Sequence, residues 1–162
     1  MDYFPFRKSF ETDLKKLRLP ADCQQREPGW EPTHPPLVWT VEVFFDFSDH
    51  KHIRIWESYD KIAKLYMSRK TQWAYHYGDT ASFDETGDAV RGSPDDPLDL
   101  RIDTCSGLHM HYQKREPHYK QDDIEGIDLT AVGALDFVRA VFTHRRTGKP
   151  LSEVLGFRIK SL

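Results

Sequence analysis

The sequence predicts an α+β domain in which one long C-terminal helix packs on a mainly antiparallel sheet of about five strands. Segments of alternating apolar and polar residues follow one another along the chain, which is typical of half-buried antiparallel strands. A helical pattern from Asp128 to Arg146 has an apolar face that needs a partner. The 162 residues suit a single domain, with an N-terminal helix and proline-rich arm over 1–36 and an α+β body over 37–162.

Composition favours a folded protein in a reducing compartment. Hydrophobic residues make up 38% of the chain and aromatic residues 13%, which argues against global disorder. The net charge of −3 gives no long-range attraction for polyanions, so nucleic-acid binding would depend on local patches such as His144-Arg145-Arg146. Cys23 and Cys105 are far apart and predict no disulfide framework. Without an apolar run of signal-peptide or membrane-span length, we expect a cytoplasmic protein with no membrane association.

The N-terminal region predicts a short helix and then an extended arm. Ser9 is a suitable N-cap for a helix over 9–17, whose last turn is basic as the helix dipole prefers. The arm over 21–36 is rich in proline and glycine, so we expect it to form neither helix nor strand ladder. Trp30 is expected to anchor the arm to the body.

The first part of the body predicts three strands. Alternation is clearest over 37–47, and a returning strand over 52–57 completes a hairpin. The segment over 60–66 favours a short helix, although its alternation also fits a continuation of the strand. Another strand, with aromatic residues on one side, is predicted over 71–77.

The C-terminal half predicts a loop, a hairpin, the long helix and a last strand. The polar loop over 83–97 is long enough to be mobile or to act as a lid. The long helix has Asp128 as N-cap and Gly148 as C-cap. A short edge strand is predicted over 157–159. The buried stripe of the helix is expected to contain Ala134, Phe137, Val138, Val141 and Phe142.

The hairpin after the polar loop carries the strongest chemical signal in the chain. Alternation places Arg101 and Asp103 on one face with His109 and His111, while the neighbouring apolar residues point the other way. A three-residue loop over 105–107, with its glycine in the left-handed conformation, sets Asp103 opposite His109 and Arg101 opposite His111. This face is the predicted site.

One chemistry for this site needs no metal. Asp103 would orient His109 as the general base, and His111 would act as the general acid. Arg101 would bind an anionic group and stabilise developing charge. The set suits the hydrolysis of RNA or another phosphodiester.

The alternative is a divalent transition metal bound by His109 and His111 with Asp103 or Glu116. The run from His109 to Glu116 resembles the first metal motif of the cupins. A third possibility is a non-catalytic binding or accessory protein with an aromatic partner surface, because tryptophan is enriched at binding hot spots. That surface would use Trp30, Trp39, Trp56 and Trp73.

A series of short motifs follows in order between Trp73 and His144. They are Tyr75-His76-Tyr77-Gly78, Ile102-Asp103, Gly107, His109-Met110-His111, Tyr119 and Asp136-Phe137. This order resembles the TumE type of toxin from bacterial toxin–antitoxin pairs. The resemblance implies a small α+β toxin that acts on RNA or another nucleotide-containing target and has an antitoxin partner.

Overall fold

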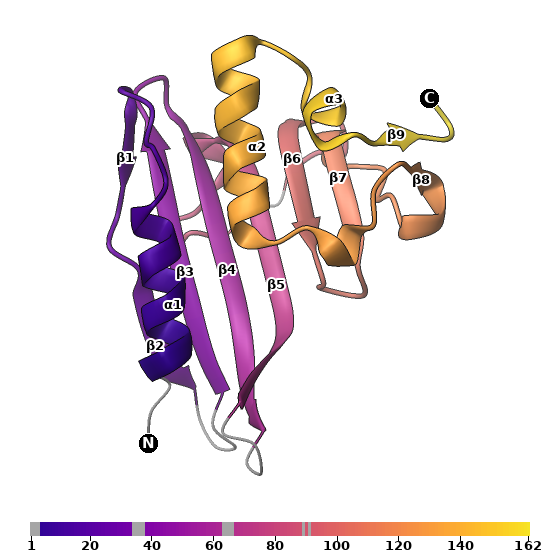
Figure 1. Cartoon of the computed structure of the whole chain (residues 1–162). Coiled ribbons are helices and arrows are strands. Elements are labelled where there is room, and N and C mark those ends of the chain that lie inside the picture. Colours follow the sequence, from indigo (N-terminus) through magenta and orange to yellow (C-terminus); the bar gives the residue numbers. More distant parts are fainter. Residues whose placement is uncertain (1–3, 34–37, 63–66, 89, 91) are drawn as a thin grey trace.

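The computed structural model describes residues 4–33, 38–62, 67–88, 90 and 92–162. Its main sheet contains β1 (Cys23–Gln25), β2 (Gly29–Thr33), β3 (Val38–Phe47), β4 (Lys51–Ile62), β5 (Met67–Asp79), β6 (Pro97–Asp103) and β7 (His109–Lys114). The seven strands are antiparallel in the order β1-β3-β4-β5-β6-β7, with β2 also paired to β3. Helices α1 (Phe4–Lys15) and α2 (Ala134–Thr147) cover the same face of this sheet (Figure 1).

The core lies between the sheet and the two helices. Alternate residues of β3, including Val41, Val43 and Phe45, are fully buried, as the period-2 pattern predicts. From α2, Phe137 and Val141 are equally buried against them. The predicted α+β class is confirmed, and the predicted number of strands is wrong because the sheet has seven rather than about five.

The two additional strands come from the proline-rich arm, which was expected to form no ladder. Gly29 to Thr33 pair with β3, with Pro32 opposite Trp39. Proline is tolerated there because β2 is an edge strand whose outward N–H groups need no partner in the sheet. Trp30 packs edge-on against Phe10, and its indole N–H donates to a Glu11 carboxylate oxygen at 2.9 Å. Both partners belong to α1, so these contacts tie the arm to the N-terminal helix, whereas the expectation was an anchor to the body.

Two predicted helices differ in the structure. Strand β4 continues to Ile62 after a register shift at Ser58/Tyr59, so the favoured helix over 60–66 is wrong for 60–62, and 63–66 lie outside the described residues. Continuation of the strand was the alternative interpretation of this segment. It is the one observed, because residues 60–62 of β4 pair with β5. Helix α1 begins at Phe4, earlier than the predicted start at 9.

The long helix begins later than predicted. Asp128 does act as a cap, but of a 3-10 turn, where its carboxylate accepts from Thr130 N at 2.9 Å. Asp136 accepts from Gly133 N at 3.0 Å at the start of α2. The predicted C-cap is confirmed, because Gly148 has φ 72°, a left-handed conformation that suits glycine.

The C-terminal strand is not an edge of the main sheet. Helix α3 (Leu151–Leu155) is followed by β9 (Arg158–Ile159), which pairs with β8 (Ile124–Glu125) in a separate two-stranded sheet. Both cysteines are free, Cys23 buried and Cys105 exposed. Within the described ranges, no helix combines the length and apolar character needed to cross a bilayer.

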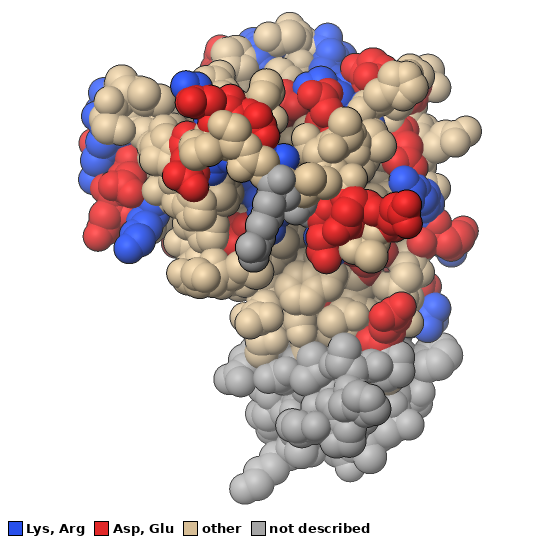
Figure 2. Space-filling view, turned by 180° about the vertical axis from the view of Figure 1, so that it is seen from behind, with Lys and Arg blue, Asp and Glu red and all other residues tan. Residues whose placement is uncertain are grey.

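The segment between β5 and β6 crosses the sheet face opposite the helices. We call residues 80–88 and 92–96 the strap. Asp88 of the strap lies 3.2 Å from the Arg54 guanidinium on β4, and Asp96 lies 3.6 Å from Nε of Arg115. On this side of the molecule acidic and basic side chains are interspersed (Figure 2). The acidic loop is therefore held to the sheet by ion pairs.

Candidate functional site

The hairpin formed by β6 and β7 has the register that the sequence predicts. Asp103 pairs with His109 and Arg101 with His111. The connecting turn contains Ser106 at φ 60° and Gly107 at φ 96°, so two consecutive residues are left-handed. This register places four ionisable side chains on the face away from the core.

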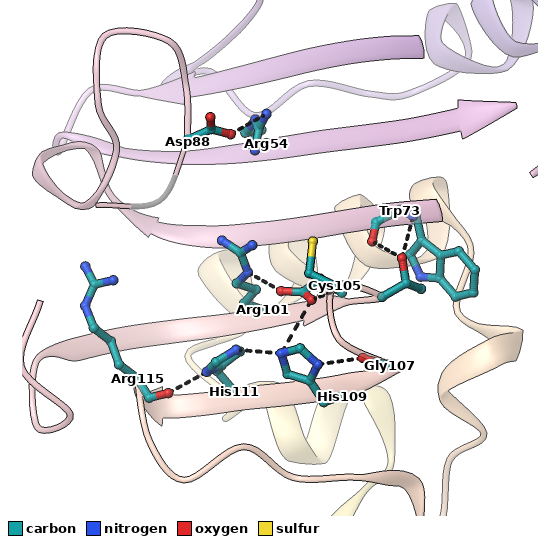
Figure 3. A network of polar contacts seen from close by, with 11 residues as sticks. Arg54, Trp73, Asp88, Arg101, Cys105, Gly107, His109, His111 and Arg115 are labelled. Carbon is teal, nitrogen blue, oxygen red and sulfur yellow. Dashed lines mark hydrogen bonds and ion pairs between the residues drawn. The ribbon is translucent and has the colours of Figure 1, made fainter. Parts of the chain in front are cut away.

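Thr104 fixes the start of the turn against the neighbouring strand β5. The Trp73 N–H donates to Thr104 Oγ1 at 3.0 Å, and the Thr104 N–H donates to Trp73 O at 3.1 Å. Figure 3 shows Trp73 on the strand next to the one that carries Arg101. The backbone that carries Asp103 is therefore tied to β5 as well as to β7.

Backbone carbonyls orient both imidazoles of the pair. His109 Nδ1 donates to Gly107 O at 2.7 Å, and His111 Nδ1 donates to Arg115 O at 2.5 Å (Figure 3). Because a carbonyl oxygen only accepts, each neutral ring carries its proton on Nδ1 and a lone pair on Nε2. The two Nε2 atoms lie 3.0 Å apart. Two acceptors thus face each other, an arrangement that a cation between them stabilises.

Asp103 lies at the centre of a polar chain. Its Oδ2 accepts from Arg101 Nε at 2.5 Å, and its Oδ1 accepts from the Cys105 N–H at 2.9 Å. The same Oδ1 is 3.4 Å from His109 Nε2. Asp103 therefore faces Nε2 of His109, because the turn carbonyl of Gly107 occupies Nδ1.

A third imidazole completes the group. The Met110 and Tyr119 backbones exchange two hydrogen bonds of 2.8 Å, which bring the chain after β7 back alongside it. The ring of His118 consequently stacks on the ring of His109, with centroids 4.7 Å apart and planes 5° from parallel. The centroid of the His118 ring is also 4.2 Å from that of the His111 ring. One ligand nitrogen from each of the three rings lies within 4.8 Å of the other two.

The three imidazoles border a pocket of about 810 Å³. Its walls supply three cationic side chains, Arg101, Arg115 and Lys120, against the carboxylates of Asp103 and Glu116. This volume is in the range of small-molecule sites. The pocket therefore combines metal-ligating nitrogens with cationic and anionic side chains.

Burial determines the electrostatics of the imidazoles. It lowers the pKa of His111 to about 4, with further lowering by His118 and His109, so this ring is neutral at pH 7. His76, opposite Arg101 on β5, is also buried, and burial lowers its pKa well below the usual value. Both nitrogens of His76 are without a hydrogen-bond partner in the described structure.

The structure brings together the four predicted catalytic residues, but not every predicted metal ligand. Arg101, Asp103, His109 and His111 meet on one face. Glu116 is exposed on the pocket wall, and the three-histidine group does not include it. His118 was not predicted as a ligand. Its only sequence signal is a third histidine shortly after the His-x-His pair.

Comparison of the chain with known protein families, with curated proteins and with solved structures finds no match. The functional argument therefore depends on the geometry of the site.

Proposed function

We propose that this protein is a metal-dependent enzyme whose divalent transition-metal ion is bound by His109, His111 and His118. The facing Nε2 atoms of the first two residues carry the proposal. Two nitrogens bound to one ion at about 2.1 Å are separated by about 3.0 to 3.4 Å at common ligand angles, and the observed separation is 3.0 Å. A histidine that binds a metal through one ring nitrogen usually donates a hydrogen bond from its other ring nitrogen, often to a backbone carbonyl, and this bond fixes the orientation of the ring. Nδ1 of His109 and Nδ1 of His111 make such bonds.

His118 supports the same proposal. Its ring is exposed and stacked on His109, so it can turn toward an ion without disturbing the core. Three protein ligands leave coordination positions for water and substrate, which is the pattern of catalytic rather than structural sites.

The chemistry that fits these residues is hydrolysis of a phosphodiester. The ion would lower the pKa of a bound water, and Asp103, 3.4 Å from His109 Nε2, would accept its proton. The resulting hydroxide would form a new P–O bond as the ester P–O bond breaks. The proton would then pass to the leaving alkoxide. Arg101 and Lys120 on the pocket wall would hold the phosphate oxygens.

The test combines metal content with turnover. Purified protein is titrated with Zn²⁺ and Mn²⁺, and hydrolysis of bis(p-nitrophenyl) phosphate is followed with and without chelator. We expect one bound ion per chain and activity that chelation removes and metal restores. His109→Ala and His118→Ala should lose binding, while His50→Ala, an exposed turn residue, should retain it. A wild-type protein that binds neither metal would overturn the proposal.

A metal-free mechanism is the second candidate, and the chain from Arg101 through Asp103 to His109 favours it. A proton shared by the two Nε2 atoms would replace the ion, with His109 and His111 as base and acid on RNA or another phosphodiester. Hydrolysis that survives chelation but disappears in the His109→Ala/His111→Ala variant would select this mechanism.

The toxin-like role and the antitoxin partner remain predictions of the sequence resemblance. Expression in a bacterial host tests them. Wild-type protein should arrest growth and degrade RNA, whereas the His109→Ala/His111→Ala variant should not. Normal growth with intact RNA would argue instead for a small-molecule substrate or for the accessory role.

A further inference from the structure

A second pocket, of about 1010 Å³, lies on the helix-covered side of the molecule and shares no lining residue with the pocket of His109, His111 and His118. The segment that follows α1 forms one wall and the C-terminal half of α2 forms the other, with Tyr77 of β5 also contributing. We call this the α2 groove. Figure 1 shows α1 and α2 on the same face of the sheet.

Both carboxylates of the α2 groove form ion pairs with one arginine, Arg145. Asp22 lies 2.9 Å from Arg145 Nη2, and Asp49 lies 3.1 Å from Arg145 Nη1. The same guanidinium donates to Tyr77 Oη at 3.0 Å and lies over the ring of Phe47 at 3.9 Å. Arg145 is thus a fixed structural cation, and neither acid is available to the other basic residues of the groove.

Three other cations of the groove have no such partner. Arg18, Arg139 and Arg146 line it and are exposed, and none forms an ion pair with a described residue. Arg139 and Arg146 are seven positions apart on α2, which places them on one helix face about 10 Å apart along the axis. Thr143 lies between them and adds a hydroxyl group. A chain of net charge −3 therefore concentrates unpaired positive charge at this groove.

The groove also has an apolar component. Leu17, Leu19 and Phe142 line it, and Leu19 is 41% exposed, among the few large apolar side chains of the described residues that remain open to solvent. Inorganic phosphate would leave this surface uncovered. A ligand with an anionic head and an apolar body would satisfy both parts.

We propose that the α2 groove binds a small amphiphilic organic anion, with Arg139 and Arg146 holding its carboxylate or phosphate head and the leucine side chains covering its apolar body. The proposal is independent of the metal centre, because the groove shares no lining residue with the histidine pocket.

The test uses 1-anilinonaphthalene-8-sulfonate, an amphiphilic anion whose fluorescence rises on binding, and N-phenyl-1-naphthylamine, its uncharged analogue. The native protein should bind one equivalent of the anion and bind the neutral analogue much more weakly. Arg139→Gln/Arg146→Gln should raise the Kd of the anion by at least about tenfold, because two charge-assisted contacts are lost. Lys8→Gln/Lys160→Gln removes the same charge at exposed sites outside the groove and should leave the Kd unchanged.

Competition identifies the head group. Octanoate or octyl phosphate should displace the probe from wild-type protein, and the more effective competitor indicates a carboxylate or a phosphate ligand. Circular dichroism before each titration verifies that the variants are folded. Equal Kd values for wild type and the double arginine variant, equal binding of the neutral analogue, or no displacement by either competitor would overturn the proposal.

Discussion

The ring of Phe83 lies against the imidazole of His52, with centroids 3.5 Å apart. The same Phe83 ring lies 4.2 Å from His76, so one aromatic side chain of the strap covers two histidines. Both imidazoles are 2% exposed, and their four ring nitrogens have no hydrogen-bond partner in the described structure. A charged imidazole is therefore strongly disfavoured at either position.

This contact predicts a pH-dependent stability. Burial lowers the pKa of His52 to about 4, whereas the unfolded chain titrates near 6.5. Between these values only the unfolded state takes up the proton, so the free energy of unfolding falls as the pH drops from 6.5 toward 4. His52 accounts for about 3 kcal/mol of that loss. Between pH 7 and pH 4.5 in urea unfolding, His52→Leu should reduce the loss by about 2.4 kcal/mol.

The matched control is His50→Leu, since His50 is exposed in the preceding turn. This variant should keep the pH dependence of the wild-type protein. The explanation fails if His52→Leu shows the same pH dependence as the wild-type protein.

Phe137 is the packing centre of α2. It is fully buried, and its ring contacts Tyr75 of the sheet with centroids 5.7 Å apart. Phe137→Ala should lower the free energy of unfolding by about 3 to 5 kcal/mol, because a large cavity opens between helix and sheet. Arg139→Ala, on the exposed side of the same helix, should change it by less than about 0.5 kcal/mol. Similar values for the two variants in urea denaturation would contradict this packing arrangement.

Glu57 is a buried carboxylate with polar partners. It accepts hydrogen bonds from the hydroxyls of Tyr59 and Tyr75 and lies 3.6 Å from the Lys70 ammonium. Glu57→Leu should cost about 3 to 5 kcal/mol, because it leaves buried polar partners uncompensated. Tyr75→Phe removes one hydroxyl and should cost about 1 kcal/mol. A double-mutant cycle in urea measures the coupling, and additive effects would show that the two residues do not interact.

Asp103→Asn separates proton transfer from metal binding. The three proposed ligands remain, and backbone carbonyls rather than Asp103 hold Nδ1 of His109 and His111. The Kd for Zn²⁺ should therefore rise by less than the roughly 10- to 100-fold that is typical when such a partner is lost. The proton acceptor is lost, so kcat should fall by about a hundredfold or more. Parallel metal titration and turnover measurements distinguish these effects. Loss of metal binding in this variant would instead identify Asp103 as a ligand.

The hairpin could be predicted from sequence because each of its determinants is local. Alternation assigns the faces, and Gly107 supplies the turn, so the pairing of Asp103 with His109 follows from a few neighbouring residues. The coarse architecture was also predictable, because the stripe around Phe137 has a helical period and the strand around Val43 a period of two.

The remaining features depend on contacts that no local pattern encodes. His118 reaches the site only because Met110 and Tyr119 pair across a loop. The pairing of β2 was unexpected because it contains Pro32. Proline is tolerated only in an edge strand, and the local sequence does not show that β2 is one. The extent of β4 to Ile62 depends on its neighbour β5. In each case the tertiary partner overrides an ambiguous local signal.

All three proposed ligands belong to the single stretch from His109 to His118. Because strand and return segment are contiguous, the spacing His-x-His-x6-His is a compact signature that can be searched for in genomes even where the rest of a chain has diverged. Because the ligands are contiguous in sequence, the proposed centre could also be transferred to another protein. A β-hairpin of another scaffold that received residues 107–119, with a carboxylate opposite the first histidine, would carry the three ligands together with the Gly107 carbonyl and the Met110–Tyr119 pairing that position them.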